Sequence, residues 1–360
     1  PGAQYAALMV NTMSSLASAF TILFLFWSIT HLGRRITAVR GQELTPARTW
    51  AVLGAGLVGA LAYAFTDTFW FSAIEGEVYA LSSLFTAVVF WAILKWEEEA
   101  DEPHANRWLV LIAYLMGLSI GVHLLNLLAI PAIVFIYYFK KTPKVTAWGV
   151  VKVTLLAAAI LLFINNIVIP YTVAAGAVVD RWFVNGLGLP VNSGLLTFVL
   201  LLIALLAGGI YLTYRKGLAV RNTVLLCLAV ILVGYSSYAS VVIRASANPP
   251  MNSNDPDNAY ALLYFLNRDQ YGTKPLLTGA QYPAPIEDMN YTTKYYLDTE
   301  GKYRASETVT DYTYPAEFVT LFPRMWSTNP AHVAGYKEWG RVDKGKTVFY
   351  RGERFELPTC

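Results

Sequence analysis

Three carboxylic acids, Asp67, Glu75 and Glu77, lie within eleven residues of an otherwise uncharged, aromatic-rich stretch at residues 66–79. A carboxylate at a membrane surface can act as a general base that takes a proton from an acceptor hydroxyl and makes it a stronger nucleophile. Capping and solvation at a helix N-terminus are an open alternative for Asp67 and Glu75. Glu77 is followed at once by an apolar run, so we expect it to lie deepest and to be the leading catalytic candidate.

Four further polar residues are candidates for substrate binding. His123 and Asn126 lie at a turn between two apolar runs, where they would contact a lipid headgroup or satisfy exposed backbone groups. Asp180 and Arg181 are adjacent; an Arg near the interface suits phosphate capture, and a surface ion pair between the two is the alternative. Placed on one helix, Glu75 and Glu77 would point about 200° apart, which argues against a carboxylate pair.

Composition excludes several classes of protein. The chain has 360 residues, of which 56% are hydrophobic and 14% charged, so it is not a disordered chain or a small disulfide scaffold. A net charge of +3 is too small to indicate nucleic-acid binding. No phosphate-binding glycine loop, HExxH or CxxC motif occurs, and we predict no metal site. The oxygen-rich stretch at residues 252–258 does not fit an EF-hand and predicts a turn followed by a helix cap.

Long apolar runs predict a mainly α, polytopic membrane helix bundle in residues 1–244, which carry only 15 Lys and Arg and 10 Asp and Glu. The run at residues 108–139 is too long for one crossing, so we divide it at a turn near residues 121–123. This gives eight predicted helices, near residues 6–30, 50–66, 78–95, 108–121, 125–139, 148–168, 195–213 and 222–243.

The positive-inside rule supports this division, because it collects nearly all loop cations on one side. These cations are Arg34, Arg35, Arg40, Arg48, Lys95, Arg107, Lys140, Lys141, Lys144, Arg215, Lys216 and Arg221. The four acids Asp67, Glu75, Glu77 and Asp180 then face outward, as do the start of the chain and residues 245–360. An outward start without an initiator Met or a basic signal region predicts at least one further helix ahead of Pro1.

Residues 245–360 carry 12 Lys and Arg and 14 Asp and Glu, and we predict a small α/β or α+β extracytoplasmic domain there, separate from the helical domain at 1–244. Asp255 followed by Pro256 is typical of an N-cap, which predicts a helix over residues 258–267. Short β-like runs follow at residues 274–278, 291–297, 303–310 and 346–350. Twelve of the 23 tyrosines lie after residue 244.

Several stretches resemble a family of large bacterial membrane proteins, labelled a domain of unknown function, that is similar to a eukaryotic transmembrane protein O-mannosyltransferase. The matching stretches are residues 20–32, 68–82, 121–132, 248–250 and 320–325. The resemblance implies a GT-C type glycosyltransferase of the bacterial inner membrane. Such an enzyme moves a sugar from a polyprenyl-phosphate donor to a protein or glycan hydroxyl on the periplasmic side. Its partners would be that lipid-linked donor, which is a substrate and not a cofactor, and the acceptor; the residues support no divalent metal.

The resemblance carries Glu77 over as the acidic position, with Glu75 second, and His123 matches its motif. It also implies a main catalytic acid in a first outward loop, and no position of this sequence matches that acid. Two other functions stay open on the sequence alone. A lipid or glycan transporter or flippase would use discontinuous helices such as the short fourth and fifth. A non-catalytic membrane anchor would present a Tyr-rich, carbohydrate-binding tail.

Overall fold

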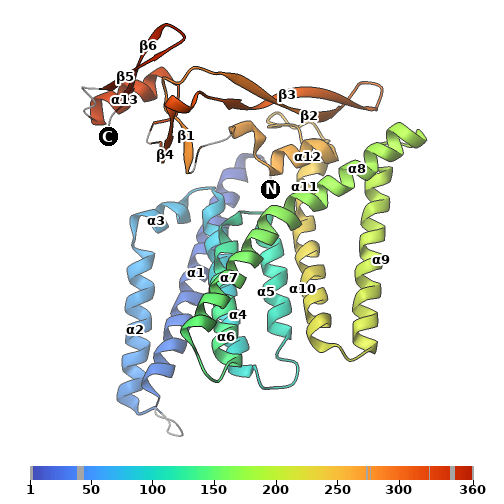
Figure 1. The fold of residues 1–360 in the computed structure, drawn as a ribbon. Helices are drawn as coiled ribbons and strands as arrows, with labels where there is room; N and C mark the ends of the chain where they lie inside the picture. The colour runs from blue at the N-terminus through green and yellow to red at the C-terminus, as the bar shows by residue number, and fades with distance from the viewer. Residues whose placement is uncertain are drawn as a thin grey trace. The chain divides into compact units, whose positions relative to one another are not determined.

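The computed structural model describes residues 3–38, 44–272, 275, 277–323, 325–340 and 345–358. The chain divides into two compact units, which we describe separately (Figure 1). Unit 1 comprises Pro1–Thr172 and Thr197–Pro249, and unit 2 comprises Val173–Leu196 and Pro250–Cys360. A domain boundary at residue 244 stays a prediction; in this division Val173–Leu196 groups with the C-terminal part of the chain.

Unit 1 is built from helices, as the apolar runs predict. Seven of the helices that the structure describes are long and apolar enough to cross a membrane, which suggests a multi-pass membrane protein. The predicted mainly α bundle is confirmed. Its elements are η1 (Ala3–Tyr5), α1 (Ala6–Thr37), α2 (Pro46–Ala64), α3 (Asp67–Ile74), α4 (Val78–Glu99), α5 (Arg107–Ile120), η2 (Leu124–Ala129), α6 (Ile130–Lys141), α7 (Ala147–Phe163), most of α9 (Ser193–Arg215), α10 (Ala219–Tyr235), η4 (Ser236–Tyr238) and α11 (Ala239–Ala245).

Small side chains hold these helices together. One face of α1 buries Ser14, Ala17, Ser18, Thr21 and Ser28, and α1 packs against α2, α3 and α4. In a lipid environment close backbone approach replaces the hydrophobic effect as the main source of helix association, which favours such small residues. The α5–α10 contact is closer still, because Gly117 of α5 and Gly234 of α10 leave no room for a Cβ beside the facing backbone.

The predicted division of residues 108–139 is confirmed. Helix α5 ends at Ile120, residues 121–123 form a turn, and the chain resumes as η2 and α6. The loop predicted between the second and third crossings contains the short helix α3, whose Asp67 lies in the first turn. The positions of these turns therefore agree with the prediction from the sequence, whereas the short helix α3 inside the loop was not predicted.

The predicted C-terminal end of the sixth helix is wrong. The helix continues past residue 168 as α7, the π-helical turn η3 (Ile164–Val168) and α8 (Ile169–Leu187), a run of 41 residues. Pro170 would clash with the carbonyl four residues earlier in a regular α-helix. The wider turn before it, in which the Ile169 N–H donates to the Ile164 carbonyl, accommodates the proline without ending the helix.

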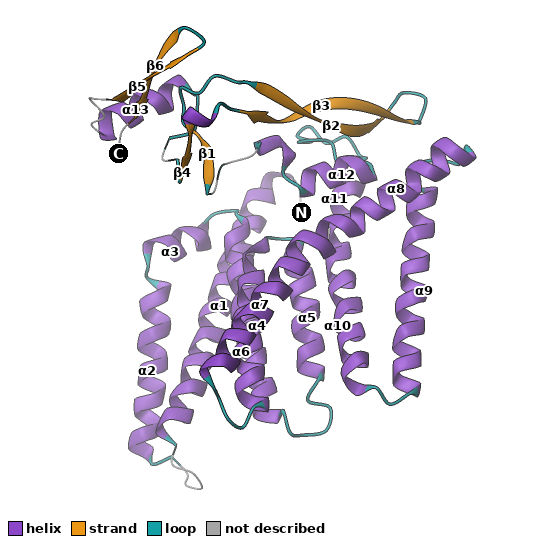
Figure 2. Cartoon of the chain, in the orientation of Figure 1, coloured by secondary structure: helices purple, strands orange, loops and turns teal. Residues whose placement is uncertain are grey.

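Unit 2 combines the end of α8 and the start of α9 with the C-terminal residues. Its elements there are α12 (Ala259–Leu266), η5 (Asp269–Tyr271), β1 (Thr278–Ala280), β2 (Asp288–Leu297), β3 (Tyr303–Thr313), η6 (Ala316–Phe318), β4 (Val319–Leu321), α13 (Pro330–Gly340), β5 (Gly345–Tyr350) and β6 (Glu353–Pro358). The described strands pair antiparallel as β1–β4, β2–β3 and β5–β6, three two-stranded sheets (Figure 2). This confirms a small mixed α and β part.

The structure of unit 2 corrects details of the prediction made from the sequence. The N-cap of α12 is Asn258 and not Asp255, because the Asn258 side chain accepts the N–H groups of Tyr260 and Ala261. The predicted strands at 291–297, 303–310 and 346–350 are present, and the first, at 274–278, begins outside the described residues. The core of the unit packs Ala177 and Val184 of α8 against Ala259, Tyr260 and Tyr303. Strands β4 and β6 and helix α13 were not predicted.

Candidate functional site

The three acids of the predicted catalytic group lie at one end of unit 1, which we call the α3 end. Asp67 is in the first turn of α3, Glu75 is its C-cap, and Glu77 is the N-cap of α4. Glu75 and Glu77 have extended backbones and share no helix, so the expected 200° separation does not apply. All three side chains are exposed.

Contacts with α1 fix the link between α3 and α4. The Ser15 hydroxyl donates to the Ala73 carbonyl over 2.9 Å. A Cβ at Gly76 would meet Val10 Cγ1 at 3.0 Å and Asn11 Oδ1 at 3.3 Å, so the link lies directly against α1. Glycine between the two glutamates therefore lets their carboxylates project from a segment that is pressed onto the bundle.

His123 and Asn126 belong to the same end of unit 1. The His123 ring lies 5.6 Å from the Tyr79 ring in the first turn of α4, and its Nδ1 accepts the Leu125 N–H over 3.1 Å. This bond places the proton of a neutral His123 on Nε2. Asn126 is fully buried and donates to the Ser119 hydroxyl over 3.0 Å, while its Oδ1 has no partner in the described part of the chain.

The structure thus brings the start of α4 beside the break between α5 and α6. Tyr79 is two residues after Glu77 and contacts His123. The described contacts include none between the carboxylates and His123.

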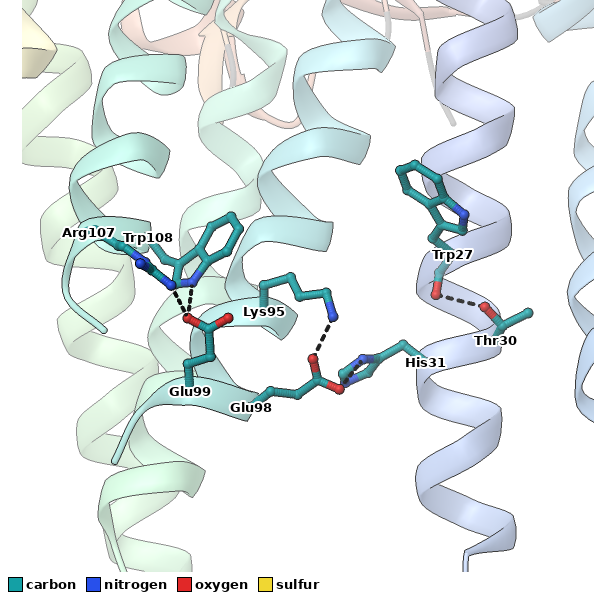
Figure 3. Close-up of polar contacts among 8 residues, drawn as sticks. All are labelled: Trp27, Thr30, His31, Lys95, Glu98, Glu99, Arg107 and Trp108. Atoms are coloured by element: carbon teal, nitrogen blue, oxygen red, sulfur yellow. Dashed lines mark hydrogen bonds and ion pairs between the residues drawn. The ribbon is translucent and has the colours of Figure 1, made fainter. Parts of the chain in front are cut away.

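Acids at the opposite end of unit 1 behave differently. Glu98 bonds Lys95 Nζ at 2.7 Å and His31 Nδ1 at 3.2 Å, and Glu99 accepts from both Arg107 and Trp108 at 2.8 Å (Figure 3). These pairs fasten α4 to α1 and to α5.

Two further acids of that end, Glu97 and Asp101, are paired in the same manner. Glu97 bonds Arg35. Hydrogen bonds from Lys140 and Lys141 hold the pKa of Asp101 below its ordinary value. By contrast, the side chains of Asp67, Glu75 and Glu77 make no hydrogen bond or ion pair with the residues that the structure describes. The three carboxylates at the α3 end are therefore available to accept a hydrogen bond or a proton.

Asp180 and Arg181 lie in unit 2. Asp180 is fully buried, and its carboxylate accepts the N–H groups of Asn192, Gly194 and Leu195 at 2.9–3.2 Å and the Tyr303 hydroxyl at 2.8 Å. Three of these donors are at the start of α9, so Asp180 caps that helix from α8. Burial and the bond to Asp180 raise the pKa of Tyr303.

Arg181 makes no surface pair with Asp180, so that alternative is wrong. Its guanidinium lies 3.9 Å from the ring centroid of Tyr295 in a cation–π contact. Nearby, Asn185 donates to the Tyr303 carbonyl at 2.7 Å and accepts the Tyr303 N–H at 3.0 Å. A role in substrate binding stays a prediction for both Asp180 and Arg181.

Tyr303 and Asn185 are the positions that sequence reasoning missed. Their partners lie 118 to 123 residues away in the chain, and no local pattern marks them. One local feature could have marked Asn185. It is an amide side chain in a helix that continues beyond the apolar run in which it begins. In the described part of the chain, no group of three His, Cys, Asp or Glu side chains is placed to hold a metal ion.

Comparison with known families bears directly on the α3 end. Residues 1–146 match the family model of the protein O-mannosyl-transferase TMEM260 N-terminal domain. All three acids, His123 and Asn126 lie inside this TMEM260-like region, which confirms the resemblance seen in the sequence and suggests O-mannosyltransferase-like activity. Residues 272–360 match a family of unknown function, DUF8416. No curated protein and no solved structure matches the chain.

Proposed function

We propose that the protein is a GT-C type membrane glycosyltransferase that moves a sugar, mannose by resemblance, from a polyprenyl-phosphate donor to a hydroxyl of a protein or glycan. One observation carries the proposal. The TMEM260-like region presents three exposed carboxylates without partners among the described residues, one at the start of α3 and two on the link after it that α1 holds in place. We place this α3 end and residues 245–360 on the periplasmic side of a bacterial inner membrane.

In the proposed reaction Glu77 is the general base. It takes the proton of the acceptor hydroxyl while the oxygen bonds to the anomeric carbon of the sugar. The bond between that carbon and the phosphate oxygen breaks, and the polyprenyl phosphate leaves with the electron pair. Glu75, on the same turn, and Asp67, at the start of α3, would orient the acceptor or the sugar.

The leaving phosphate needs donors or positive charge to stabilise it. His123 suits this role, because its Nδ1 is occupied by the Leu125 N–H and its Nε2–H is the remaining donor. Asn126 stabilises the break that presents His123, through its bond to Ser119. Arg181 belongs to unit 2, and its predicted role in substrate binding is separate from this step.

The test is transfer by the full-length protein in proteoliposomes, with labelled polyprenyl-phosphate mannose and an acceptor peptide. Glu77→Gln keeps the size of the side chain and removes the base, which should lower the rate about 100-fold or more. Glu102→Gln is the matched control, because Glu102 is also an exposed acid of unit 1 but lies at the opposite end. Absent transfer, or equal rates in the two variants, contradicts the assignment.

Transport is the second candidate, favoured by two interruptions of the helices. These are the α5–η2–α6 break with buried Asn126 and the π-turn before Pro170. Transporters use discontinuous helices in this way. Movement of the lipid-linked sugar across the proteoliposome membrane without a covalent product would favour this function over transfer.

A further inference from the structure

Unit 2 contains a cleft that is separate from the carboxylates of the α3 end. Its walls are α12 with the segment before it and the last residues of β2 with the turn that follows. The volume is about 680 Å³, within the range of roughly 300–1,000 Å³ that is usual for small-molecule sites. All lining residues fall between Asn254 and Thr299, inside one unit.

Hydrogen bonds hold the two walls in register. The Tyr264 hydroxyl on α12 accepts the Tyr295 N–H on β2 over 2.7 Å, and Lys294 pairs with Asp269 at 2.6 Å. Asn258 caps α12 at the mouth of the cleft. A cleft that is already ordered loses little conformational freedom when a ligand enters.

Aromatic surface makes up one part of the lining. Tyr264, Tyr295 and Tyr296 all contribute, and Tyr296 is 52% exposed. A tyrosine combines a flat apolar face with a hydroxyl. The Tyr264 oxygen already accepts a hydrogen bond from Tyr295, so its O–H remains a donor.

Carboxylates make up the other part, and two of them carry no cation. Asp269 is paired with Lys294, and Asp298 with Arg304 at 2.7 Å. Asp255 and Asp257 accept only neutral amides, from Asn252 at 2.6 Å and Asn258 at 2.8 Å, both through Oδ1. Their Oδ2 atoms have no donor in the described part of the chain, and both residues line the cleft, so each carboxylate can accept a further hydrogen bond.

These groups match the chemistry of a sugar ring. A pyranose offers hydroxyl donors to carboxylates on its edge and apolar C–H groups to an aromatic face. A basic side chain fits less well, because Lys294 lies 5.0 Å over Tyr264 and Arg181 lies 3.9 Å over Tyr295. Cations already lie over these two tyrosine rings, so a second cation could not stack on them in the same way.

We propose that this cleft binds a neutral saccharide, with Asp255 and Asp257 accepting hydrogen bonds from its hydroxyls and Tyr296 packing on its ring. The volume exceeds that of a single pyranose ring, so the ligand class includes disaccharides and the ends of longer glycans. The site goes beyond the proposed transfer reaction and does not depend on it.

The experiment is saturation-transfer NMR on the full-length protein in a phosphocholine detergent, because detergents with sugar headgroups would compete. The probes are methyl α-mannoside, mannobiose and cellobiose. We expect saturation transfer from the protein to the ring protons of at least one probe. Asp257→Asn should weaken its Kd about tenfold, since a hydrogen bond to a charged acceptor is lost. Tyr296→Ala should weaken it several-fold.

Tyr291→Ala is the matched control, because Tyr291 is an exposed tyrosine of the same strand that does not line the cleft. It should bind like the wild type, and so should Glu77→Gln, which separates this site from the transfer reaction. The proposal is overturned if no probe receives saturation, if Asp257→Asn and Tyr296→Ala both bind normally, or if an oligolysine peptide displaces the saccharide through Asp255 and Asp257.

Discussion

Replacing Asp180 with alanine tests how much the hydrogen bonds of this α8 residue stabilise unit 2. The carboxylate accepts four hydrogen bonds among the described residues, from the Asn192, Gly194 and Leu195 N–H groups and from the Tyr303 hydroxyl. The bonds from Gly194 and Tyr303 are buried, whereas the other two are partly buried. We expect Asp180→Ala to loosen the start of α9 and the β2–β3 hairpin together.

The magnitude follows from burial. A hydrogen bond to a charged group contributes about 1.5–3 kcal/mol. Water cannot reach the two buried donors, so their loss costs at least about 3 kcal/mol. If water also fails to replace the partly buried bonds, the loss approaches about 6 kcal/mol. Since about 1.4 kcal/mol is tenfold in an equilibrium constant, local opening should become roughly 100-fold more frequent or more.

Hydrogen exchange measured by mass spectrometry reads this opening directly. Peptides over residues 190–196 and 300–306 should exchange about 100-fold faster in Asp180→Ala, and peptides from α4 should not change. Glu307→Gln is the control, because Glu307 is an exposed acid of β3 without a bond between its side chain and a described residue. Wild-type exchange at both peptides in Asp180→Ala, or equal acceleration in the control, would refute the reasoning.

Three further predictions concern pH and packing. The pKa of Tyr303 is raised above its ordinary value of 10.0, so its contribution to stability is present below that pH and is lost above it; Tyr303→Phe should flatten the fall in Tm above pH 10. The pKa of Asp298 is lowered from 3.8, chiefly by the hydrogen bond from Arg304, so protection of the β2–β3 hairpin against hydrogen exchange should fall below about pH 4, and less so in Asp298→Asn. Gly117→Ala would place a Cβ against the Ile231 backbone and should lower the stability by about 1–3 kcal/mol, whereas Gly54→Ala, in open space on α2, should not; thermal unfolding in detergent compares them.

Helix positions in unit 1 were predictable because membrane insertion depends on local apolarity and loop charge. The division of residues 108–139 shows this most clearly. Neither half looks unusual alone, but one helix over all 32 residues would have placed Lys140 and Lys141 apart from the other cations. The break appears at residues 121–123.

The end of the sixth helix was not predictable in the same way. The uncharged run continues to residue 179, yet the predicted helix ended at residue 168, before Asp180 and Arg181. The helix persists to Leu187 because Asp180 and Asn185 find partners more than ten residues along the chain, on α9 and on β3. The positive-inside rule predicts that Asp180 faces outward. In the structure it is buried, and its tertiary donors offset the cost of burying a carboxylate.

The candidate site was likewise predictable only in part. The acids of the α3 end were visible because they interrupt an uncharged stretch, but the sequence did not show that Gly76, between Glu75 and Glu77, lies against Val10 and Asn11. The saccharide cleft had no linear signal. It forms when Tyr264 of α12 bonds the backbone of β2, 31 residues later.

The acids of the membrane region differ in whether their carboxylates already hold hydrogen-bond or ion-pair partners and in the end of unit 1 at which they lie. A proton acceptor for catalysis must be reachable and must not already hold donors. Glu98 and Glu99 hold cations, and Asp180 is buried beneath its own donors. Asp67 lies within the first turn of α3, where the backbone N–H groups and the helix dipole already favour its charge.

Glu75 and Glu77 remain, on either side of Gly76. Glu77 begins the helix whose first turn contacts His123, and its side chain makes no capping bond that would restrain it. Glu75 ends α3 and has no such neighbour among the described contacts. If this reasoning holds, the rate of sugar transfer falls furthest in Glu77→Gln, less in Glu75→Gln and least in Asp67→Asn. A larger loss in Asp67→Asn than in Glu77→Gln would move the base to the other end of α3.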